Sequence, residues 1–265
     1  MISESRCPVQ DGELLVRQGG EGPVLLLIPG GTGAADAYRA LAKQLSADYT
    51  VVSYDRRGHF GSTDKTSGPV AVSLQADDAL AVLDQVGAGP VAVFGTSAGA
   101  LIGLDLVARH PDRVSTLVAH EPPAVHLMPD GSGWLDAAAE YVRLARSGSL
   151  MAAVKGFADA IAGAGLPDLP NARLPHEADW LRLFDRELTG FFDYLPDLRA
   201  LRRASTEILP VAGEGSRGHY HYQPAKILAL ELGLPFTEMP GAHLAPQRNP
   251  TKFAAALRDL LSPEL

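Results

Sequence analysis

Short apolar runs alternate with segments of helical periodicity along most of this chain. Residues 24–28 and 91–94 are continuous apolar runs, typical of strands that a parallel sheet buries on both faces. Residues 74–86 carry apolar side chains at helical spacing and are followed by Gly87, a common helix stop. Further strands are predicted at 13–16, 50–54, 115–120, 207–212 and 236–239, and further helices at 98–109, 225–232 and 250–261. Strands that alternate with helices predict an α/β fold with a doubly wound, mostly parallel sheet.

The pattern changes between about residues 134 and 203, where the sequence predicts helices and no strand. A stretch rich in Gly and Pro at 163–175 interrupts these helices. We therefore expect a core domain formed by residues 1–122 and 204–265, with residues 123–203 inserted as a helical lid. Ligands bind at the carboxyl ends of the strands in doubly wound sheets, so the loops after the predicted strands are candidates for the functional site.

Charge and composition narrow the classes of partner. The formal net charge is −8, so the chain has no basic footprint for nucleic acid. No apolar stretch reaches membrane-spanning length, and residues 1–11 lack the apolar core of a signal peptide. The single cysteine, Cys7, cannot form an internal disulfide, which fits a reducing compartment. We expect a cytoplasmic monomer or homodimer that binds a small-molecule substrate and neither nucleic acid nor membrane.

The apolar run at 91–94 leads into Gly95-Thr96-Ser97-Ala98-Gly99, and a predicted helix follows. This pattern is typical of a sharp strand-to-helix turn that exposes the hydroxyl of one serine. The two glycines have a steric reason, because such a turn brings neighbouring backbone close to both positions. Ser97 has an alternative interpretation as the N-cap of the helix. The motif alone does not decide between the two, so other landmarks are needed.

Three other landmarks accompany this motif. They are the turn Ile28-Pro29-Gly30-Gly31, the loop Asp55-Arg56-Arg57-Gly58, and Gly241-Ala242-His243 after a late strand. In this order and spacing, the four landmarks resemble the α/β-hydrolase fold over nearly the whole chain. The resemblance implies that Ser97 is a nucleophile and His243 its general base, since a serine hydroxyl is a poor nucleophile until an imidazole accepts its proton. His59 is the best competitor among the other histidines, but its loop favours a role in the pocket wall.

The resemblance also implies an oxyanion hole that is formed by two backbone N–H groups. One belongs to Ala98, directly after the nucleophile, and the second to the turn after residues 24–28. We expect Gly31 to supply the second donor, with Gly30 and Thr32 beside it in the same loop. Pro29 stands where many relatives have histidine, which changes the stiffness of the loop more than its supply of amides.

The acid of the predicted triad has two candidates. Most of the family places an Asp after the strand that corresponds to residues 207–212, but here that loop has glycine at the expected position, and Glu214 lies one position earlier. In some haloalkane dehalogenases and a minority of other members, the acid follows the strand after the nucleophile helix. There it lies eight residues beyond an Arg, and the same count from Arg113 leads to Glu121. Any carboxylate that reaches the distal ring nitrogen can orient the imidazole. We expect Glu121, with Glu214 as the alternative.

A serine at this turn argues against haloalkane dehalogenase and epoxide hydrolase chemistry, for which family members use Asp. It favours acyl transfer: hydrolysis of an ester, lactone, thioester or amide, or hydrolytic cleavage of a C–C bond. This chemistry requires no cofactor and no metal, and His219 and His221 stand two positions apart without a third ligand in view. The alternatives are a non-hydrolytic enzyme of secondary metabolism, catalysing cyclisation or elimination, and a non-catalytic ligand-binding relative.

Aromatic residues of the predicted lid indicate an apolar or aromatic substrate. Trp134, Tyr141 and Phe184 are the candidates for its binding, together with Gly30 and Thr32 of the oxyanion loop. The competing interpretation is that these aromatic side chains form the lid's own core.

Overall fold

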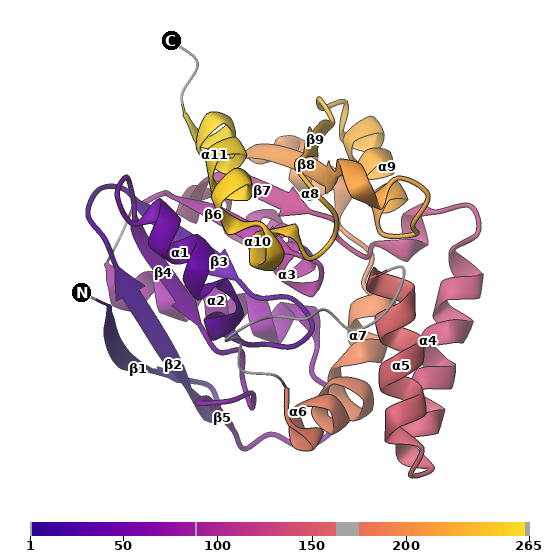
Figure 1. Cartoon of the computed structure of the whole chain (residues 1–265). Helices are drawn as coiled ribbons and strands as arrows, with labels where there is room; N and C mark the ends of the chain where they lie inside the picture. The colour runs from indigo at the N-terminus through magenta and orange to yellow at the C-terminus, as the bar shows by residue number, and fades with distance from the viewer. Residues whose placement is uncertain (1, 88, 163–174, 263–265) are drawn as a thin grey trace.

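The protein has a central sheet of mostly parallel strands with helices on both faces (Figure 1). A computed structural model describes residues 2–87, 89–162 and 175–262. Within these ranges the sheet has the order β1-β2-β4-β3-β6-β7-β8-β9, and β5 pairs with β2. The strands are β1 (Ser3–Val9), β2 (Gly12–Gly19), β3 (Val24–Ile28), β4 (Thr50–Tyr54), β5 (Thr63–Asp64), β6 (Val91–Thr96), β7 (Val114–His120), β8 (Glu207–Gly213) and β9 (Thr237–Met239). The strands from β4 to β9 along this order pair in parallel, which confirms the predicted fold class.

Two layers of helices cover the sheet, and alternate side chains of each buried strand face one layer or the other. Leu25 and Leu27 of β3 pack in the layer of α1 and α11, whereas Leu26 and Ile28 pack in the layer of α2 and α3. The first layer contains α1 (Arg39–Leu45), α10 (Ala245–Arg248) and α11 (Pro250–Leu261), and the second α2 (Val72–Val86), α3 (Ala98–Arg109), α8 (Leu198–Arg203) and α9 (Tyr222–Leu232). This two-sided burial explains why residues 24–28 form an uninterrupted apolar run.

Further helices lie between β7 and β8 in the sequence and stand together beside the sheet (Figure 1). They are α4 (Gly131–Arg146), α5 (Leu150–Ala162), α6 (Glu177–Arg182), a π-helical turn (Leu183–Glu187) and α7 (Leu188–Phe192). Short 3₁₀ turns occupy Ala35–Tyr38, Pro111–Arg113, Val125–Leu127 and Glu214–Ser216. The Gly- and Pro-rich break lies outside the described residues, apart from Pro175. The boundaries of the inserted segment and its role as a lid stay predictions.

The strand β1 is absent from the sequence-based prediction. Its side chains are mostly exposed and only Cys7 is buried, so it carries no apolar periodicity. β1 is an edge strand that is held by antiparallel pairing with β2, and backbone hydrogen bonds require no sequence signal. Two predicted helices also begin too late: α2 starts at Val72 instead of residue 74, and α9 at Tyr222 instead of residue 225.

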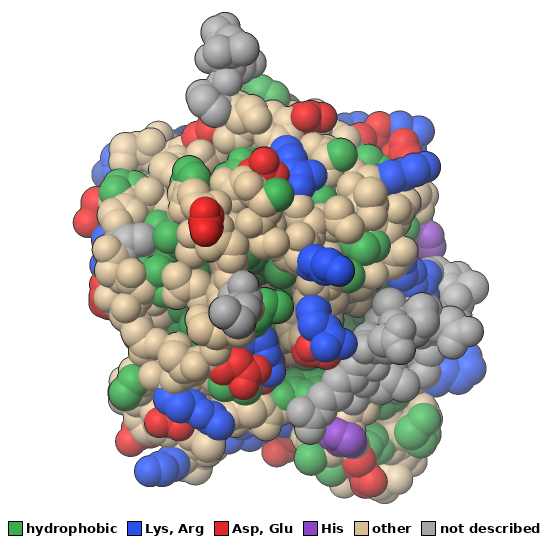
Figure 2. Space-filling model, turned by 60° about the vertical axis from the view of Figure 1, so that its left-hand side comes forward, with side chains coloured by type: hydrophobic (Ala, Val, Ile, Leu, Met, Phe, Trp, Pro, Cys, Tyr) green, Lys and Arg blue, Asp and Glu red, His purple; other side chains and the backbone are tan. Residues whose placement is uncertain are grey.

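The charge distribution and the length of the helices are relevant to the predictions about nucleic acid and membranes. On the face shown in Figure 2, acidic and basic side chains are interspersed, and neither sign forms a patch of its own. Among the described residues, no helix combines the length and the apolar character that crossing a bilayer requires. The cytoplasmic location and the oligomeric state stay predictions.

Candidate active site

Ser97 lies at the sharp turn between β6 and α3. Its backbone has φ 55° and ψ −125°, a strained conformation for a residue with a side chain, and its hydroxyl makes no capping bond to α3. The flanking glycines are sterically required. A Cβ on Gly95 would lie 2.3 Å from the carbonyl oxygen of Gly99, and a Cβ on Gly99 would lie 2.2 Å from the carbonyl oxygen of Ile28. The turn therefore presents the serine side chain at the carboxyl edge of the sheet.

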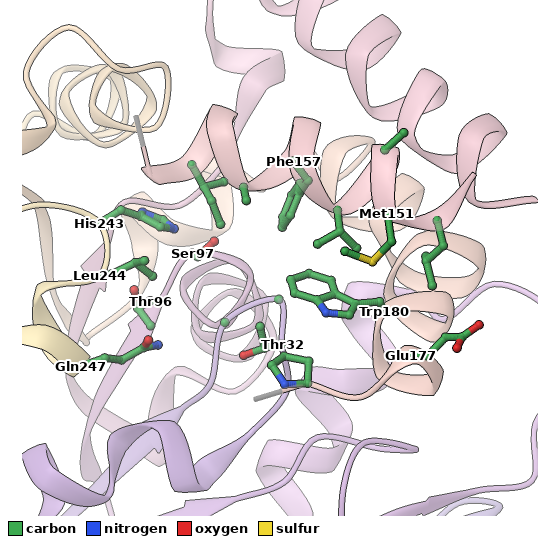
Figure 3. Close-up of a pocket in the computed structure, with 18 of the residues that line it drawn as sticks. Thr32, Thr96, Ser97, Met151, Phe157, Glu177, Trp180, His243, Leu244 and Gln247 are labelled. Atoms are coloured by element: carbon green, nitrogen blue, oxygen red, sulfur yellow. The ribbon is translucent and has the colours of Figure 1, made fainter. Parts of the chain in front are cut away.

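His243 follows β9 and shares a pocket with Ser97. The two side chains point toward each other in Figure 3. The Nδ1 atom of His243 lies 2.6 Å from Oε2 of Glu121. Because an ionised carboxylate can only accept, Nδ1–H donates this bond, which leaves Nε2 as the free, basic nitrogen of the ring.

Glu121 is fully buried after β7, in a backbone conformation with φ 49°. Its Oε1 atom accepts a hydrogen bond from the N–H of Gly213 at 2.7 Å, and its own N–H donates to the carbonyl oxygen of Val211 at 2.9 Å. Burial alone would raise the pKa of Glu121, but the hydrogen bond from His243 and the neighbouring imidazoles hold it well below its ordinary value. The carboxylate is thus fixed at both oxygens.

Glu214, the alternative acid, is exposed in the 3₁₀ turn after β8. The end of β8 packs closely against the turn that leads to His243. A Cβ on Gly213 would lie 2.4 Å from the carbonyl oxygen of Gly241 in that turn, so Gly213 has no room for a side chain. The carboxylate that contacts His243 comes from the end of β7.

The loop after β3 passes directly over the serine. A Cβ on Gly30 would lie 3.3 Å from the Cβ of Ser97, and Gly30, Gly31 and Thr32 all line the pocket. Ala98 is the first residue of α3, and the N–H of a first helical residue has no acceptor within the helix. Gly31 thus lines the pocket that contains Ser97, and Ala98 is the next residue after Ser97; the role of both as oxyanion donors stays a prediction.

Two buried histidines beside this group were not predicted to belong to the site. His120 ends β7, and its Nδ1 lies 2.9 Å from Oγ1 of Thr96. His221 lies with its Nε2 3.4 Å from Oε2 of Glu121 and 3.3 Å from Oγ of Ser216. In the sequence, the pair His219 and His221 was the feature that could have indicated a histidine at the site. A spacing of two residues does not show which of the two side chains points into the protein.

Glu121, His221 and His243 place potential ligand atoms within 4.8 Å of one another. It is the one group of this kind in the described parts of the chain. The hydrogen bond between His243 and the carboxylate and the 3.4 Å contact of His221 with the same oxygen account for these distances, so the arrangement does not require a metal ion. His59 lies away from this group, with its Nε2 3.0 Å from both carboxylate oxygens of Glu187.

The pocket over Ser97 has a volume of about 650 Å³ and a mainly apolar wall. α5 and α6 supply most of this wall, opposite His243 (Figure 3). Its apolar members are Leu150, Met151, Ala152, Val154, Phe157, Ala158, Ile161, Trp180 and Leu244. Thr32, Tyr38, Thr96, Glu177 and Gln247 add polar groups, and no Lys or Arg is found among the described residues of the lining.

The three aromatic residues predicted to bind substrate lie elsewhere, and this part of the prediction is corrected. Trp134 stacks on Tyr220 with ring centroids 4.1 Å apart, and the Tyr141 hydroxyl donates to the Gly156 carbonyl at 3.2 Å. Phe184 is buried within the inserted helices. Helical periodicity indicates that a face is buried, but not whether it meets a cavity or another helix. The aromatic side chains that the inserted helices contribute to the pocket are Phe157 and Trp180.

Comparison with known proteins shows the family to which the chain belongs. Residues 23–158 match the profile of the alpha/beta hydrolase fold family. The chain belongs to this family. An uncharacterized hydrolase of Bacillus subtilis (strain 168), YraK, is 32% identical over 92% of this chain and 91% of its own. The 2-(acetamidomethylene)succinate hydrolase of Mesorhizobium japonicum is 32% identical over 40% of this α/β hydrolase and 38% of its own chain. A thermophilic esterase from Thermogutta terrifontis, solved with malate bound, has a TM-score of 0.80 and 18% identity over 98% of each chain.

The buried histidines generate a prediction about stability. Burial lowers the pKa of His120 to about 4 and that of His221 to about 2, because desolvation penalises the imidazolium form. Between pH 6.5 and 4, these two histidines therefore bind more protons in the unfolded chain than in the folded one, and their contribution to stability falls as the pH falls. We expect each histidine to contribute up to about 1.4 kcal/mol per pH unit to this slope.

Urea unfolding at pH 7, 6 and 5 measures the slope. His221→Gln should reduce the slope of unfolding free energy against pH by about the contribution of one histidine. His126→Gln, at an exposed position, should leave this slope unchanged. An unaltered slope in His221→Gln would contradict the prediction.

Proposed function

We propose that this α/β hydrolase is a serine hydrolase with Ser97 as nucleophile, His243 as general base and Glu121 as acid. The observation that carries the proposal is the strained turn that presents Ser97 to an imidazole whose distal nitrogen is bonded to a buried carboxylate. With Nδ1–H directed at Glu121, the free Nε2 of His243 accepts the proton of Ser97. The buried negative charge of Glu121 then stabilises the imidazolium that forms.

In the proposed reaction, Ser97 attacks a carbonyl carbon of the substrate. The N–H groups of Gly31 and Ala98 bind the resulting oxyanion, and His243 donates its new proton to the leaving group. Water that is activated by the same histidine then releases the acyl group from Ser97. Apart from the substrate and water, every group that takes part in these steps belongs to the protein. Helices α5 and α6 act as the lid that limits access of bulk water.

We further propose that the substrate is a small, uncharged ester, lactone, thioester or related carbonyl compound with an apolar or aromatic acyl part. The wall formed by α5 and α6 supports this choice, because burying an unpaired carboxylate against apolar side chains is costly. Glu177, at the exposed end of the lining, disfavours anions further. The Mesorhizobium japonicum relative is named for a succinate derivative, and the described wall offers no Lys or Arg for such a group.

The nucleophile is tested with a fluorophosphonate probe and with release of p-nitrophenol from p-nitrophenyl butyrate. We expect Ser97→Ala to abolish labelling and to lower kcat by at least about 10³-fold, because the acyl-enzyme cannot form. Ser149→Ala is the matched control, since Ser149 lines the same pocket and its hydroxyl has no histidine partner within the part of the chain that the structure describes. Equal labelling of Ser97→Ala and wild type would refute the serine mechanism, and a wild type that binds ligands without turnover would favour the non-catalytic alternative.

The acid is tested by two isosteric variants. Glu121→Gln should lower kcat by at least about 10²-fold, because an amide cannot hold the same tautomer or balance the imidazolium. Glu214→Gln should leave kcat within about twofold, since its side chain is exposed in a turn. The assignment is wrong if the loss of activity follows Glu214 instead.

The preference for uncharged substrates is tested with two esters of similar size. We expect kcat/KM for p-nitrophenyl butyrate to exceed that for p-nitrophenyl hemisuccinate by at least about tenfold, owing to the desolvation of the carboxylate. Glu177→Lys should reduce the ratio of the two kcat/KM values more than Glu177→Gln does. The lysine adds a cation, whereas the glutamine only removes an anion. Comparable turnover of both esters by the wild type would overturn the proposed substrate class.

A further inference from the structure

Arg56 is a fully buried cation in the loop after β4, and it contacts the predicted oxyanion loop directly. Its Nε donates to the carbonyl oxygen of Gly30 at 3.1 Å, and its Nη2 donates to that of Gly31 at 2.8 Å. The backbone N–H of Arg56 also donates to the carbonyl oxygen of Gly33 at 2.9 Å. One residue thus binds three carbonyl groups of the same short loop.

The geometry of the peptide bond gives these contacts a consequence. The carbonyl of Gly30 and the N–H of Gly31 belong to one peptide group, which is planar and trans, as are the other described peptide bonds. In a trans peptide the C=O and N–H bonds point to opposite sides. The Gly30 carbonyl also accepts from the N–H of Gly33 at 2.9 Å, and a cation that holds it from the side of Arg56 helps to fix the direction of the Gly31 N–H on the other side. That N–H is the predicted oxyanion donor.

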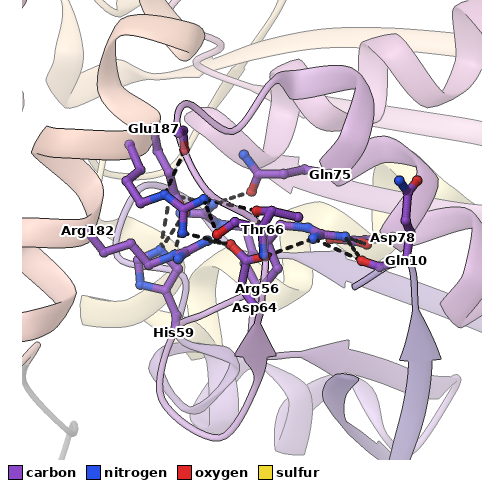
Figure 4. Close-up of polar contacts among 12 residues, drawn as sticks. Gln10, Arg56, His59, Asp64, Thr66, Gln75, Asp78, Arg182 and Glu187 are labelled. Atoms are coloured by element: carbon purple, nitrogen blue, oxygen red, sulfur yellow. Dashed lines mark hydrogen bonds and ion pairs between the residues drawn. The ribbon is translucent and has the colours of Figure 1, made fainter. Parts of the chain in front are cut away.

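Arg56 is in turn held by a residue of the inserted helices. Its Nη1 donates to Oε2 of Glu187 at 2.9 Å, and Glu187 is fully buried at the end of the π-helical turn. The same carboxylate accepts from Nε of Arg182 at 3.0 Å and contacts His59, as Figure 4 shows. Burial alone would raise the pKa of Glu187, but the charges of Arg56, His59 and Arg182 hold it well below its ordinary value. The carboxylate is therefore a permanent counter-ion for Arg56.

The adjacent Arg57 separates this arrangement from an ordinary buried ion pair. Arg57 is equally buried and contacts Asp78 at 2.5 Å and Asp64 at 3.2 Å. Its other contacts are to the carbonyl oxygen of Gln10, and none of its described bonds reaches the oxyanion loop. A buried ion pair by itself is weak evidence for any role, so the difference between the two arginines rests on what Arg56 touches.

We propose that Arg56 is a positioning residue that holds the Gly30–Gly31 peptide with its N–H directed at the reacting oxygen, and that Glu187 couples this geometry to the inserted helices. The inference rests on the proposed function, because it concerns the transition state of the same reaction. It adds to that function a link between the packing of the helical insertion and the strength of the oxyanion hole. A π-helical turn at Glu187 fits such a role, since these turns are frequent at functional sites.

The test compares Arg56→Lys with Arg57→Lys on p-nitrophenyl butyrate. Lysine keeps the charge, but its single ammonium cannot replace a planar fork that binds two carbonyls and a carboxylate. We expect Arg56→Lys to lower kcat by about 10- to 100-fold with KM within about threefold, as for a weakened oxyanion donor. Arg57→Lys should keep kcat within about threefold. Melting temperatures of both variants show whether either is simply unfolded at the assay temperature.

A second readout isolates the oxyanion hole. A trifluoromethyl ketone adds to Ser97 and forms a tetrahedral oxyanion, whereas the matching methyl ketone binds without doing so. Arg56→Lys should weaken binding of the trifluoromethyl ketone by the same factor by which it lowers kcat. It should leave the affinity for the methyl ketone unchanged. Glu187→Gln retains the guanidinium of Arg56 but removes its counter-ion, so it should show the same selective loss at smaller size. This variant decides the question if Arg56→Lys does not fold.

Equal losses in Arg56→Lys and Arg57→Lys, or equal weakening of both ketones, would overturn the positioning role while leaving the proposed function intact. Wild-type protein without Ser97-dependent turnover would instead overturn the proposed function and this inference with it.

Discussion

The hydrogen bond between His243 and the buried carboxylate of Glu121 is the contact on which the candidate site depends. It joins the loops after β7 and β9, and the N–H of Gly213 adds the end of β8 to the same carboxylate. Three neighbouring strands are therefore tied at their carboxyl ends by one side chain. Because the pairing is parallel, these ends meet at one edge of the sheet, where β6 also delivers Ser97.

Backbone crowding at this edge explains which residues occupy it. Gly95, Gly99 and Gly213 lie so close to neighbouring carbonyl oxygens that none has room for a Cβ. A side chain at position 213 is therefore excluded sterically, and the carboxylate that contacts His243 comes from β7, where the chain takes up a positive φ at Glu121. Such a conformation costs of order 1–3 kcal/mol, which the bonds of Glu121 to its neighbours offset.

Much of this architecture was predictable because its signals are local. Buried parallel strands such as 24–28 are apolar throughout, and the turn around Ser97 needs glycine at fixed spacing. The contact of Glu121 with His243 agrees with a count of residues along the chain, although the catalytic role of both stays a prediction. What the sequence did not reveal depends on distant partners. β1 forms by pairing along an exposed edge, His221 turns inward, and Trp134 packs on Tyr220 instead of facing the pocket.

The loop after β4 carries a motif that identifies the fold but does not reveal the role of each of its residues. The segment Asp55-Arg56-Arg57-Gly58 helped to identify the fold, yet its sequence does not indicate that the two arginines have different partners. Only the structure shows that Arg57 stays among core carboxylates, whereas Arg56 connects Gly30 to Glu187, 131 positions away from Arg56 in the chain. Since Glu187 lies in the inserted helices, changes in that segment can reach the oxyanion loop through one guanidinium. Substrate preference and transition-state binding would then be shaped by the same insertion, because α5 and α6 line the pocket and Glu187 holds Arg56.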